Sequence, residues 1–136
     1  MISWVCKKFD ELSPYELYAI LQLRNEVFVV EQNCPYQDAD NKDLSSWHLM
    51  GWLDDKLVAY TRILPQGVAY PDEPSIGRVV TSPSTRGGGI GRKLMEKSME
   101  ELYKLFGATP IKIGAQLYLL KFYTSLGFQQ TSEIYL

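Results

Sequence analysis

Hydrophobic residues follow two different periods along the chain, and these periods predict an alternation of strands and helices. Short runs that alternate or are rich in β-branched residues are typical of strands, whereas apolar residues spaced three and four apart are typical of helices. Helices are predicted at residues 13–28, 90–106 and 117–126. Strands are predicted at residues 2–9, 47–53, 56–64, 75–81, 111–115 and 129–136. The order of these elements predicts an α+β fold with a strand-to-helix crossover after the fourth strand.

The ends of the two longer helices carry clear signals. Ser13 is a good N-cap, Pro14 fits the first helical position, and Glu16 completes a capping box. Gly107 suits the position that stops a helix. Only Arg24 interrupts the apolar face of the first helix, which makes it a candidate for a buried charge.

Composition narrows the class of protein. The chain has 136 residues, of which 46% are hydrophobic, and a net charge of −2. That length suits one domain over residues 1–136, and the charge gives no basic field for a nucleic acid. The apolar runs are too short to cross a bilayer, no apolar signal segment opens the chain, and its cysteines do not make a disulfide framework. We therefore expect a cytoplasmic protein that binds neither nucleic acid nor membrane.

The segment TSPSTRGGGIGRKLM, residues 81–95, has four glycines among residues 87–91. Glycines at a strand-to-helix turn leave main-chain N–H groups at the positive end of the helix dipole, which makes an anion site. Arg86, Arg92 and Lys93 add positive charge nearby. The segment therefore predicts a phosphate-binding turn.

The spacing of this turn excludes two common nucleotide-binding motifs. A Walker A loop ends in lysine followed by serine or threonine, whereas Lys93 is followed by Leu94. A Rossmann G-x-G-x-x-G pattern fails as well, because neither pair of alternate glycines is followed by a third glycine at the required position.

The pattern that does fit is R-x-x-G-x-G over residues 86–91. Here the sequence resembles the GNAT superfamily of acyl-CoA-dependent N-acyltransferases, in which a Q/R-x-x-G-x-G/A turn holds the pyrophosphate of coenzyme A. The segment GAQLYLLKFYTSLGF is similar to a second signature of that family, with Gln116 in the asparagine place, Leu119 in the alanine place and Tyr123 as the tyrosine. The segments LQLRNEVFVVEQNCPYQDAD, AYTRIL and IGRVV resemble the ElaA-type subfamily, so the resemblance covers essentially the whole chain.

The resemblance implies a mixed, mostly antiparallel sheet that is splayed between its fourth and fifth strands and flanked by helices. Acetyl-CoA would bind in the splay, with main-chain groups of the fourth strand against pantetheine and the glycine turn around the pyrophosphate. No metal is implied. The residues expected to bind acetyl-CoA are Val79, Val80, Thr81, Arg86, Gly87, Gly88, Gly89, Ile90, Gly91, Arg92 and Gln116.

The family fold normally ends in two strands after the tyrosine helix, whereas this sequence shows one such pattern, at residues 129–136. The resemblance therefore implies that the C-terminal hairpin is incomplete, and it leaves open how the substrate wall that the last strand normally builds is formed. An open strand edge there could pair with a second copy, so a homodimer is one expected arrangement.

The implied reaction is direct attack of an amine on the thioester. Tyr123 would protonate the leaving thiolate, because a tyrosine with a pKa near 10 is protonated at neutral pH. A lysine-like ammonium lies about 3.4 pKa units above pH 7, about 4.6 kcal/mol, whereas an α-amine requires about 1 kcal/mol. Only a lysine-like substrate calls for a strong base. The sequence does not identify the amine acceptor, because specificity for it depends on loops 31–46 and 65–74, which carry no recognisable motif.

The sequence does not assign the general base. Many relatives carry a glutamate on the fourth strand at the position that Ser75 occupies in this chain. A histidine on a strand, such as His48, is more typical of structure than of catalysis. Candidates by chemistry alone are Glu31, His48, Asp38, Asp40 and Glu73.

Arg24, Arg62 and Arg78 stand in otherwise apolar elements. Because a buried arginine must be paired, internal ion pairs with loop aspartates are the favoured interpretation. The alternative is that these arginines bind an acidic group of the substrate.

Two further functions remain open. A non-catalytic acyl-CoA sensor of the same fold would bind coenzyme A without turnover and would be indifferent to Tyr123→Phe. A generic phosphate-binding domain would bind ATP as well as acetyl-CoA, which the spacing of the glycine turn disfavours.

Overall fold

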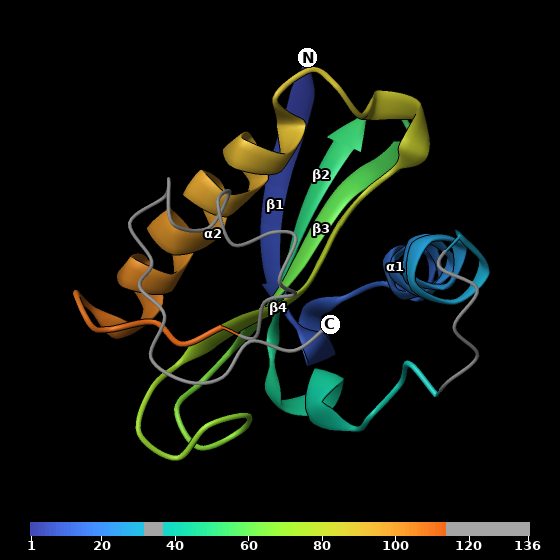
Figure 1. Cartoon of the computed structure of the whole chain (residues 1–136). Coiled ribbons are helices and arrows are strands. Elements are labelled where there is room, and N and C mark those ends of the chain that lie inside the picture. The colour runs from blue at the N-terminus through green and yellow to red at the C-terminus, as the bar shows by residue number, and fades with distance from the viewer. Residues whose placement is uncertain (32–36, 114–136) are drawn as a thin grey trace.

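The computed structural model describes residues 1–31 and 37–113 of the chain (Figure 1). One antiparallel sheet has the strand order β1-β2-β3-β4. Its strands are β1 (Ile2–Lys8), β2 (Trp47–Leu53), β3 (Lys56–Leu64) and β4 (Ser75–Thr81). The two long helices are α1 (Pro14–Arg24) and α2 (Ile90–Phe106). The helix and strand expected at residues 117–126 and 129–136 lie outside the described residues.

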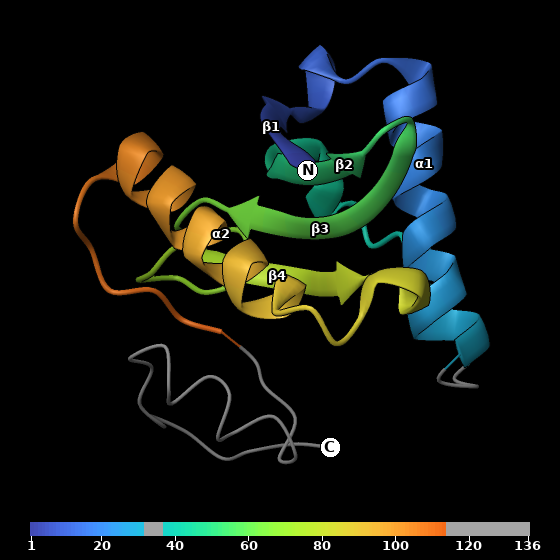
Figure 2. The same ribbon diagram turned by 90° about the horizontal axis from the view of Figure 1, so that it is seen from above.

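The sheet carries an apolar core on each face, and one helix covers each core (Figures 1 and 2). On one face, Leu94 and Leu102 of α2 are completely buried against β2, β3 and β4. On the other face, Ile20 and Leu23 of α1 pack with Met50 and neighbouring side chains of the sheet. The expected sheet with flanking helices is therefore confirmed for this part of the chain.

The first helix begins as predicted but ends differently. Ser13 and Glu16 form the expected capping box, with the serine hydroxyl accepting from the N–H of Glu16 at 3.0 Å. The α-helical part ends at Arg24, and a π-helix (Asn25–Glu31) replaces the α-helix that the sequence predicts as far as residue 28. The segment NEVFVVE is rich in β-branched and aromatic residues, which lose side-chain freedom in an α-helical turn.

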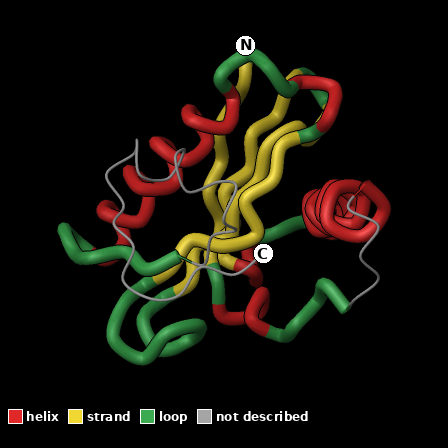
Figure 3. The backbone as a smooth tube through the Cα atoms, in the orientation of Figure 1, coloured by secondary structure: helices red, strands yellow, loops and turns green. Residues whose placement is uncertain are grey.

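The connections place the glycine turn and loop 65–74 at opposite ends of the sheet (Figure 3). A tight turn joins β2 to β3 at Asp54 and Asp55, as the sequence predicts, and Asp54 has the positive φ of 54° that such a turn requires. In the described part of the chain, no helix is long and apolar enough to cross a membrane.

A close approach at Gly51 of β2 gives a test of the packing. A β carbon there would lie 2.7 Å from Cζ3 of Trp4 and 3.1 Å from Cβ of Ala59, so one of these groups would have to move. We expect Gly51→Ala to lower the free energy of unfolding by about 1–3 kcal/mol. Urea denaturation should show a lower midpoint with an unchanged m-value.

Gly77→Ala in β4 is the matched control. Its added β carbon would meet Cδ1 of Leu64 at 3.6 Å, an ordinary van der Waals contact. An equal loss of stability in the two variants would contradict the packing argument.

Candidate functional site

The turn between β4 and α2 leads away from the sheet through a short 3-10 turn (Pro83–Thr85). The N–H of Ser82 donates to the carbonyl of Val58 at 2.7 Å, which ties the end of β4 to β3. The N–H of Thr85 then donates back to the carbonyl of Ser82 at 3.0 Å and closes the 3-10 turn. The chain is thus anchored up to the point where the glycines begin.

Two of the glycines are required by the backbone. Gly87 and Gly89 have φ angles of 95° and 78°, in the left-handed region that glycine adopts without steric cost. Gly88 has no such angle, and among the described residues a β carbon at Gly87, Gly88 or Gly89 would find no neighbouring atom within 4 Å. These glycines therefore border open space, and the conformation of the chain does not account for Gly88.

The glycine turn ends at the N-terminus of α2. Gly89 is the N-cap residue, its carbonyl accepts from the N–H of Lys93 at 3.2 Å, and no side chain in the described part of the chain caps the helix. The N–H groups of a helix's first turn have no acceptor within the helix and lie at the positive end of its dipole. Buried Ile90 anchors this end, while Arg86, Arg92 and Lys93 are exposed around it. The arrangement fits a multiply charged anion.

The outer edge of β4 continues from this turn. β4 pairs with β3 along one edge, and on its other edge Ser75 forms an isolated parallel bridge with Lys112. Among residues 1–31 and 37–113, no strand pairs with the remainder of that edge. The main-chain groups from Val79 to Thr81, which were expected to bind the acyl donor, therefore follow one another toward the glycine turn.

A β-bulge interrupts β4 in the middle of this edge. Tyr60 of β3 pairs with Val80, but Arg62 pairs with Gly77, so two residues of β4 stand opposite Thr61 alone. Arg78, one of these two residues, has a φ of 50°. A left-handed conformation is disfavoured for a residue with a β carbon by roughly 1–2 kcal/mol, so the surrounding contacts must hold it.

Three arginines and three aspartates form an ion-pair network. The aspartates belong to the loop that precedes β2, which the structure describes from residue 37 onward. Arg24, at the end of α1, is completely buried. Its Nε donates to Oδ2 of Asp38 at 2.7 Å, and its Nη1 donates to Oδ1 of Asp43 at 2.9 Å. Its Nη2 donates to the main-chain carbonyl of Asp38 at 3.1 Å, so both side chain and backbone of the loop are bound.

The other two arginines come from adjacent strands. Nη1 of Arg62 in β3 donates to Oδ1 of Asp40 at 2.7 Å and to Oδ1 of Asp43 at 3.0 Å. Nε and Nη2 of Arg78 in β4 both donate to Asp38, to Oδ1 and the carbonyl respectively, each at 2.9 Å. The expected pairing of arginines with loop aspartates is confirmed, whereas a role in substrate binding stays a prediction.

The network holds the carboxylates of Asp40 and Asp43 in the charged form. Partial burial alone would raise the pKa of Asp40, but hydrogen bonds and charge from Arg62 outweigh it and lower this pKa to about 2. Burial likewise opposes charge on Asp43, and Arg24 and Arg62 lower its pKa. Carboxylates bound in this way are weak bases at neutral pH.

His48 lies beneath this network and is almost completely buried. Its Nδ1 lies 2.6 Å from the hydroxyl of Tyr60, and its Nε2 lies 3.0 Å from the carbonyl of Asp43. Burial lowers the pKa of His48, which favours a neutral ring that donates from Nε2 and accepts at Nδ1. Both nitrogens are thus occupied by the protein, an arrangement that suits a structural histidine better than a general base.

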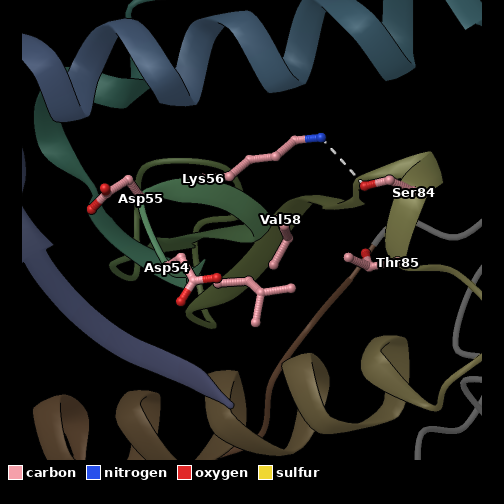
Figure 4. Close-up of a pocket in the computed structure, with 7 residues that line it drawn as sticks. Asp54, Asp55, Lys56, Val58, Ser84 and Thr85 are labelled. Atoms are coloured by element: carbon pink, nitrogen blue, oxygen red, sulfur yellow. Dashed lines mark hydrogen bonds between the residues drawn. The ribbon is translucent and has the colours of Figure 1, made fainter.

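An open hollow of about 560 Å³ lies between the β2–β3 turn and the Pro83–Thr85 turn (Figure 4). Across it, Nζ of Lys56 donates to Oγ of Ser84 at 3.3 Å. The residues that line it are Leu53, Asp54, Asp55, Lys56, Val58, Ser84 and Thr85. The hollow adjoins the start of the glycine turn, but the residues expected to bind the acyl donor are not among its lining.

The structure brings together most of the turn and strand residues that the sequence singles out. Gln116 and Tyr123 lie outside the described residues, and Glu31 is the last residue of the π-helix. Sequence reasoning did not single out Asp43 or Tyr60, although both contact His48. The equal number of arginines in apolar elements and aspartates in loop 31–46 is the signal that could have identified Asp43. In the described residues, no group of three or more His, Cys, Asp and Glu side chains is placed to hold a metal ion.

The chain is similar to known proteins in both sequence and structure. The acetyltransferase (GNAT) family matches residues 15–128. Protein ElaA of Escherichia coli strain K12 is 47% identical over 138 residues, covering 99% of this chain and 89% of that protein. The crystal structure of Escherichia coli ElaA has a TM-score of 0.94 with 46% identity, and the match covers 100% of this chain and 93% of that one.

Two further crystal structures bear on the fold. An acyl-CoA N-acyltransferase from Pseudomonas aeruginosa has a TM-score of 0.94 and 45% identity, with 100% of this chain and 94% of that chain covered. A predicted acetyltransferase with acetyl-CoA from Clostridium acetobutylicum has a TM-score of 0.71 and 17% identity, with 98% and 93% covered, and so shares the fold. The expected α+β acyltransferase fold is therefore confirmed.

The low pKa of Asp40 predicts that acid weakens the network. A depressed carboxylate pKa gives stability that is present above the unfolded-state value near 4 and is lost as the pH falls toward about 2. Because the carboxylate is partly exposed, we expect this group to account for about 1–2 kcal/mol of unfolding free energy between pH 5 and pH 2. Urea denaturation at a series of pH values should show Asp40→Asn with a shallower acid dependence than the unaltered protein. Asp72→Asn, at an exposed loop carboxylate, serves as the control, and identical acid profiles for all three proteins would contradict the prediction.

Proposed function

The chain belongs to the acetyltransferase (GNAT) family, and from this membership we propose that it transfers an acetyl group from acetyl-CoA to a primary amine. The amine attacks the thioester carbonyl directly in a ternary complex. A C–N bond forms, the C–S bond breaks, and coenzyme A leaves as the thiolate. The observation that carries the proposal is the glycine turn at the N-terminus of α2, adjacent to the outer edge of β4.

The residues of this turn fit the pyrophosphate of coenzyme A. The helix end lacks a side-chain cap in the described part of the chain, and the open space beside Gly88 allows an anion to approach the main chain. The exposed cations Arg86, Arg92 and Lys93 add attraction for the phosphates. When bound here, acetyl-CoA supplies the activated acyl group.

The outer edge of β4 supports a second contact with the same molecule. Pantetheine contains two amide groups, which can pair with main-chain N–H and C=O groups as an added strand does. Val79 of the bulge and Thr81 lie on the part of this edge that leads to the glycine turn. A ligand that extends from the turn along β4 would therefore reach the bulge with its thioester end.

Two proton transfers remain to be assigned, and we propose Tyr123 as the acid that protonates the thiolate. The described aspartates of the network are bound to arginines, and Ser75 is buried at the start of β4 where many relatives carry a glutamate. These observations support an acceptor whose amine loses its proton close to neutral pH, such as an α-amine, because it requires only about 1 kcal/mol of deprotonation at pH 7.

Release of free thiol from acetyl-CoA tests the reaction. Amino acids, peptides, polyamines and aminoglycosides should be screened at pH 7 and pH 9. We expect turnover with at least one class of amine and a fall of roughly 10²–10⁴-fold in kcat for Tyr123→Phe, the size of a general-acid contribution.

The acyl-CoA sensor is the competing function for this screen. Acetyl-CoA binding without turnover of any amine class would favour the sensor. Competition by ATP as strong as that by coenzyme A would favour a general phosphate-binding domain.

Gly88 separates binding by the turn from the stability of the turn. Because its backbone has no positive φ and its surroundings are open, we expect Gly88→Val to leave the melting temperature unchanged. The added side chain would obstruct the approach of the pyrophosphate and raise the Kd for acetyl-CoA by about tenfold or more. Isothermal titration calorimetry measures that change, with Ser84→Val in the preceding exposed turn as the control. An unchanged Kd in Gly88→Val would show that the anion binds elsewhere.

A further inference from the structure

The bulge in β4 contains Arg78, a residue in a backbone conformation that is unfavourable for its type. Arg78 has a φ of 50°, although glycine is the residue that adopts this region readily. The bulge consists of Arg78 and Val79, and the edge that continues to the glycine turn begins there. The conformation of Arg78 therefore decides the direction in which the following main-chain groups point.

The side chain of Arg78 is bound to a part of the chain far away in sequence. Its Nε and Nη2 donate to Oδ1 and the carbonyl of Asp38, each at 2.9 Å, in a two-point contact that fixes the guanidinium plane. The side chain of Asp38 is only 5% exposed, and its other oxygen accepts from Nε of Arg24 at 2.7 Å. Asp38 is thus held between α1 and β4 and cannot follow Arg78 if that residue moves.

We propose that Arg78 is a positioning residue, which by binding Asp38 holds the β4 bulge in the shape that the acyl donor requires. The inference rests on the proposed function, because it concerns the edge of β4 that would bind acetyl-CoA. It also couples two parts of the site, since the same contact fixes the start of the loop described from residue 37. A change in that loop is then transmitted to the acyl-donor edge through one side chain.

Asp38→Asn tests the coupling without altering β4. It removes the carboxylate on which Arg78 and Arg24 converge, and we expect the Kd for acetyl-CoA to rise by roughly three- to tenfold. A crystal structure of the variant should show residue 78 outside the left-handed region or β4 in an altered register with β3. An unchanged Kd together with an intact bulge would overturn the proposal. If Asp38→Asn does not fold, Asp38→Glu keeps the charge and displaces the carboxylate, and the same two measurements decide.

Arg78→Gly and Arg78→Val separate the backbone from the guanidinium. Both remove the charge, but glycine adopts a positive φ readily whereas a β-branched residue resists it. We expect Arg78→Gly to bind acetyl-CoA at least about threefold more tightly than Arg78→Val. Equal affinities would overturn the proposal. If both variants keep the affinity for acetyl-CoA but raise KM for the amine, Arg78 binds the acceptor instead.

Lys7→Gln is the control for a general loss of stability. It removes the ion pair between Nζ of Lys7 in β1 and Oε2 of Glu16 in α1, which lie 3.0 Å apart. Because this pair is remote in sequence from β4, its loss should leave the Kd for acetyl-CoA unchanged. An equal rise in Kd in this variant would overturn the specific role of Arg78. If the unaltered protein itself fails to bind acetyl-CoA, the proposed function fails. The crystal structure of Asp38→Asn then tests the positioning role alone: a φ of residue 78 outside the left-handed region supports it, and an unchanged φ contradicts it.

Discussion

The position of loop 37–46 on the sheet depends on buried ion pairs between residue types that are mostly exposed to solvent in folded proteins. Three arginine side chains from α1, β3 and β4 converge on three aspartates of one loop, and their formal charges cancel. Burial of an ion is costly unless it is paired and hydrogen-bonded, and removal of one partner typically costs about 3–5 kcal/mol. Almost every donor is satisfied: within the described residues, Nε of Arg62 is the one buried side-chain nitrogen or oxygen that lacks a hydrogen-bond partner. Directional ion pairs therefore hold the described part of the loop, from residue 37 onward, against the sheet.

Some parts of the sheet stabilise the fold, whereas others hold the backbone conformations of the proposed site. The two apolar faces bind α1 and α2 and supply the bulk of the stability, because hydrophobic burial is the dominant favourable contribution to folding. The bulge and the glycine turn, by contrast, contain backbone conformations that stability alone would not select. The ion pairs lie between these regions, and Arg78 belongs to both the network and the bulge. Local strain near the proposed acyl-donor edge is thus supported by contacts made elsewhere in the chain.

Sequence reasoning predicted the elements with strong local signals. The capping box at Ser13, the strands of the β2–β3 hairpin and the stop of α2 at Gly107 follow from side-chain chemistry within a few residues, and the structure has all three. The π-helix and the bulge could not be predicted in this way. A one-residue change in register depends on which distant side chains the displaced residues meet, and the chain contacts made by Arg78 span 40 residues.

The candidate site shows the same division. The glycine turn is visible in the sequence as a cluster of glycines, two of which the backbone requires. Its spacing carries the resemblance to the family only together with the segment around Tyr123 and the segments of the N-terminal half. The arginine pairs were expected as a class, but their partners could not be assigned one by one, because three aspartates in a polar loop offer several equivalent pairings until the loop is placed. His48 illustrates the limit: whether an imidazole acts as a base or supports the fold depends on what occupies its two nitrogens.

Recognition through the peptide backbone has a consequence for selectivity. In the proposed function, the glycine turn contacts only the diphosphate, a group common to every thioester of coenzyme A, and therefore cannot distinguish acetyl from longer chains. In the proposed function, discrimination by carbon number then arises at the thioester end of the donor, beside the bend that the bulge gives β4. A protein built in this way could change its acyl preference through substitutions near the bend while keeping its affinity for the nucleotide half of the donor.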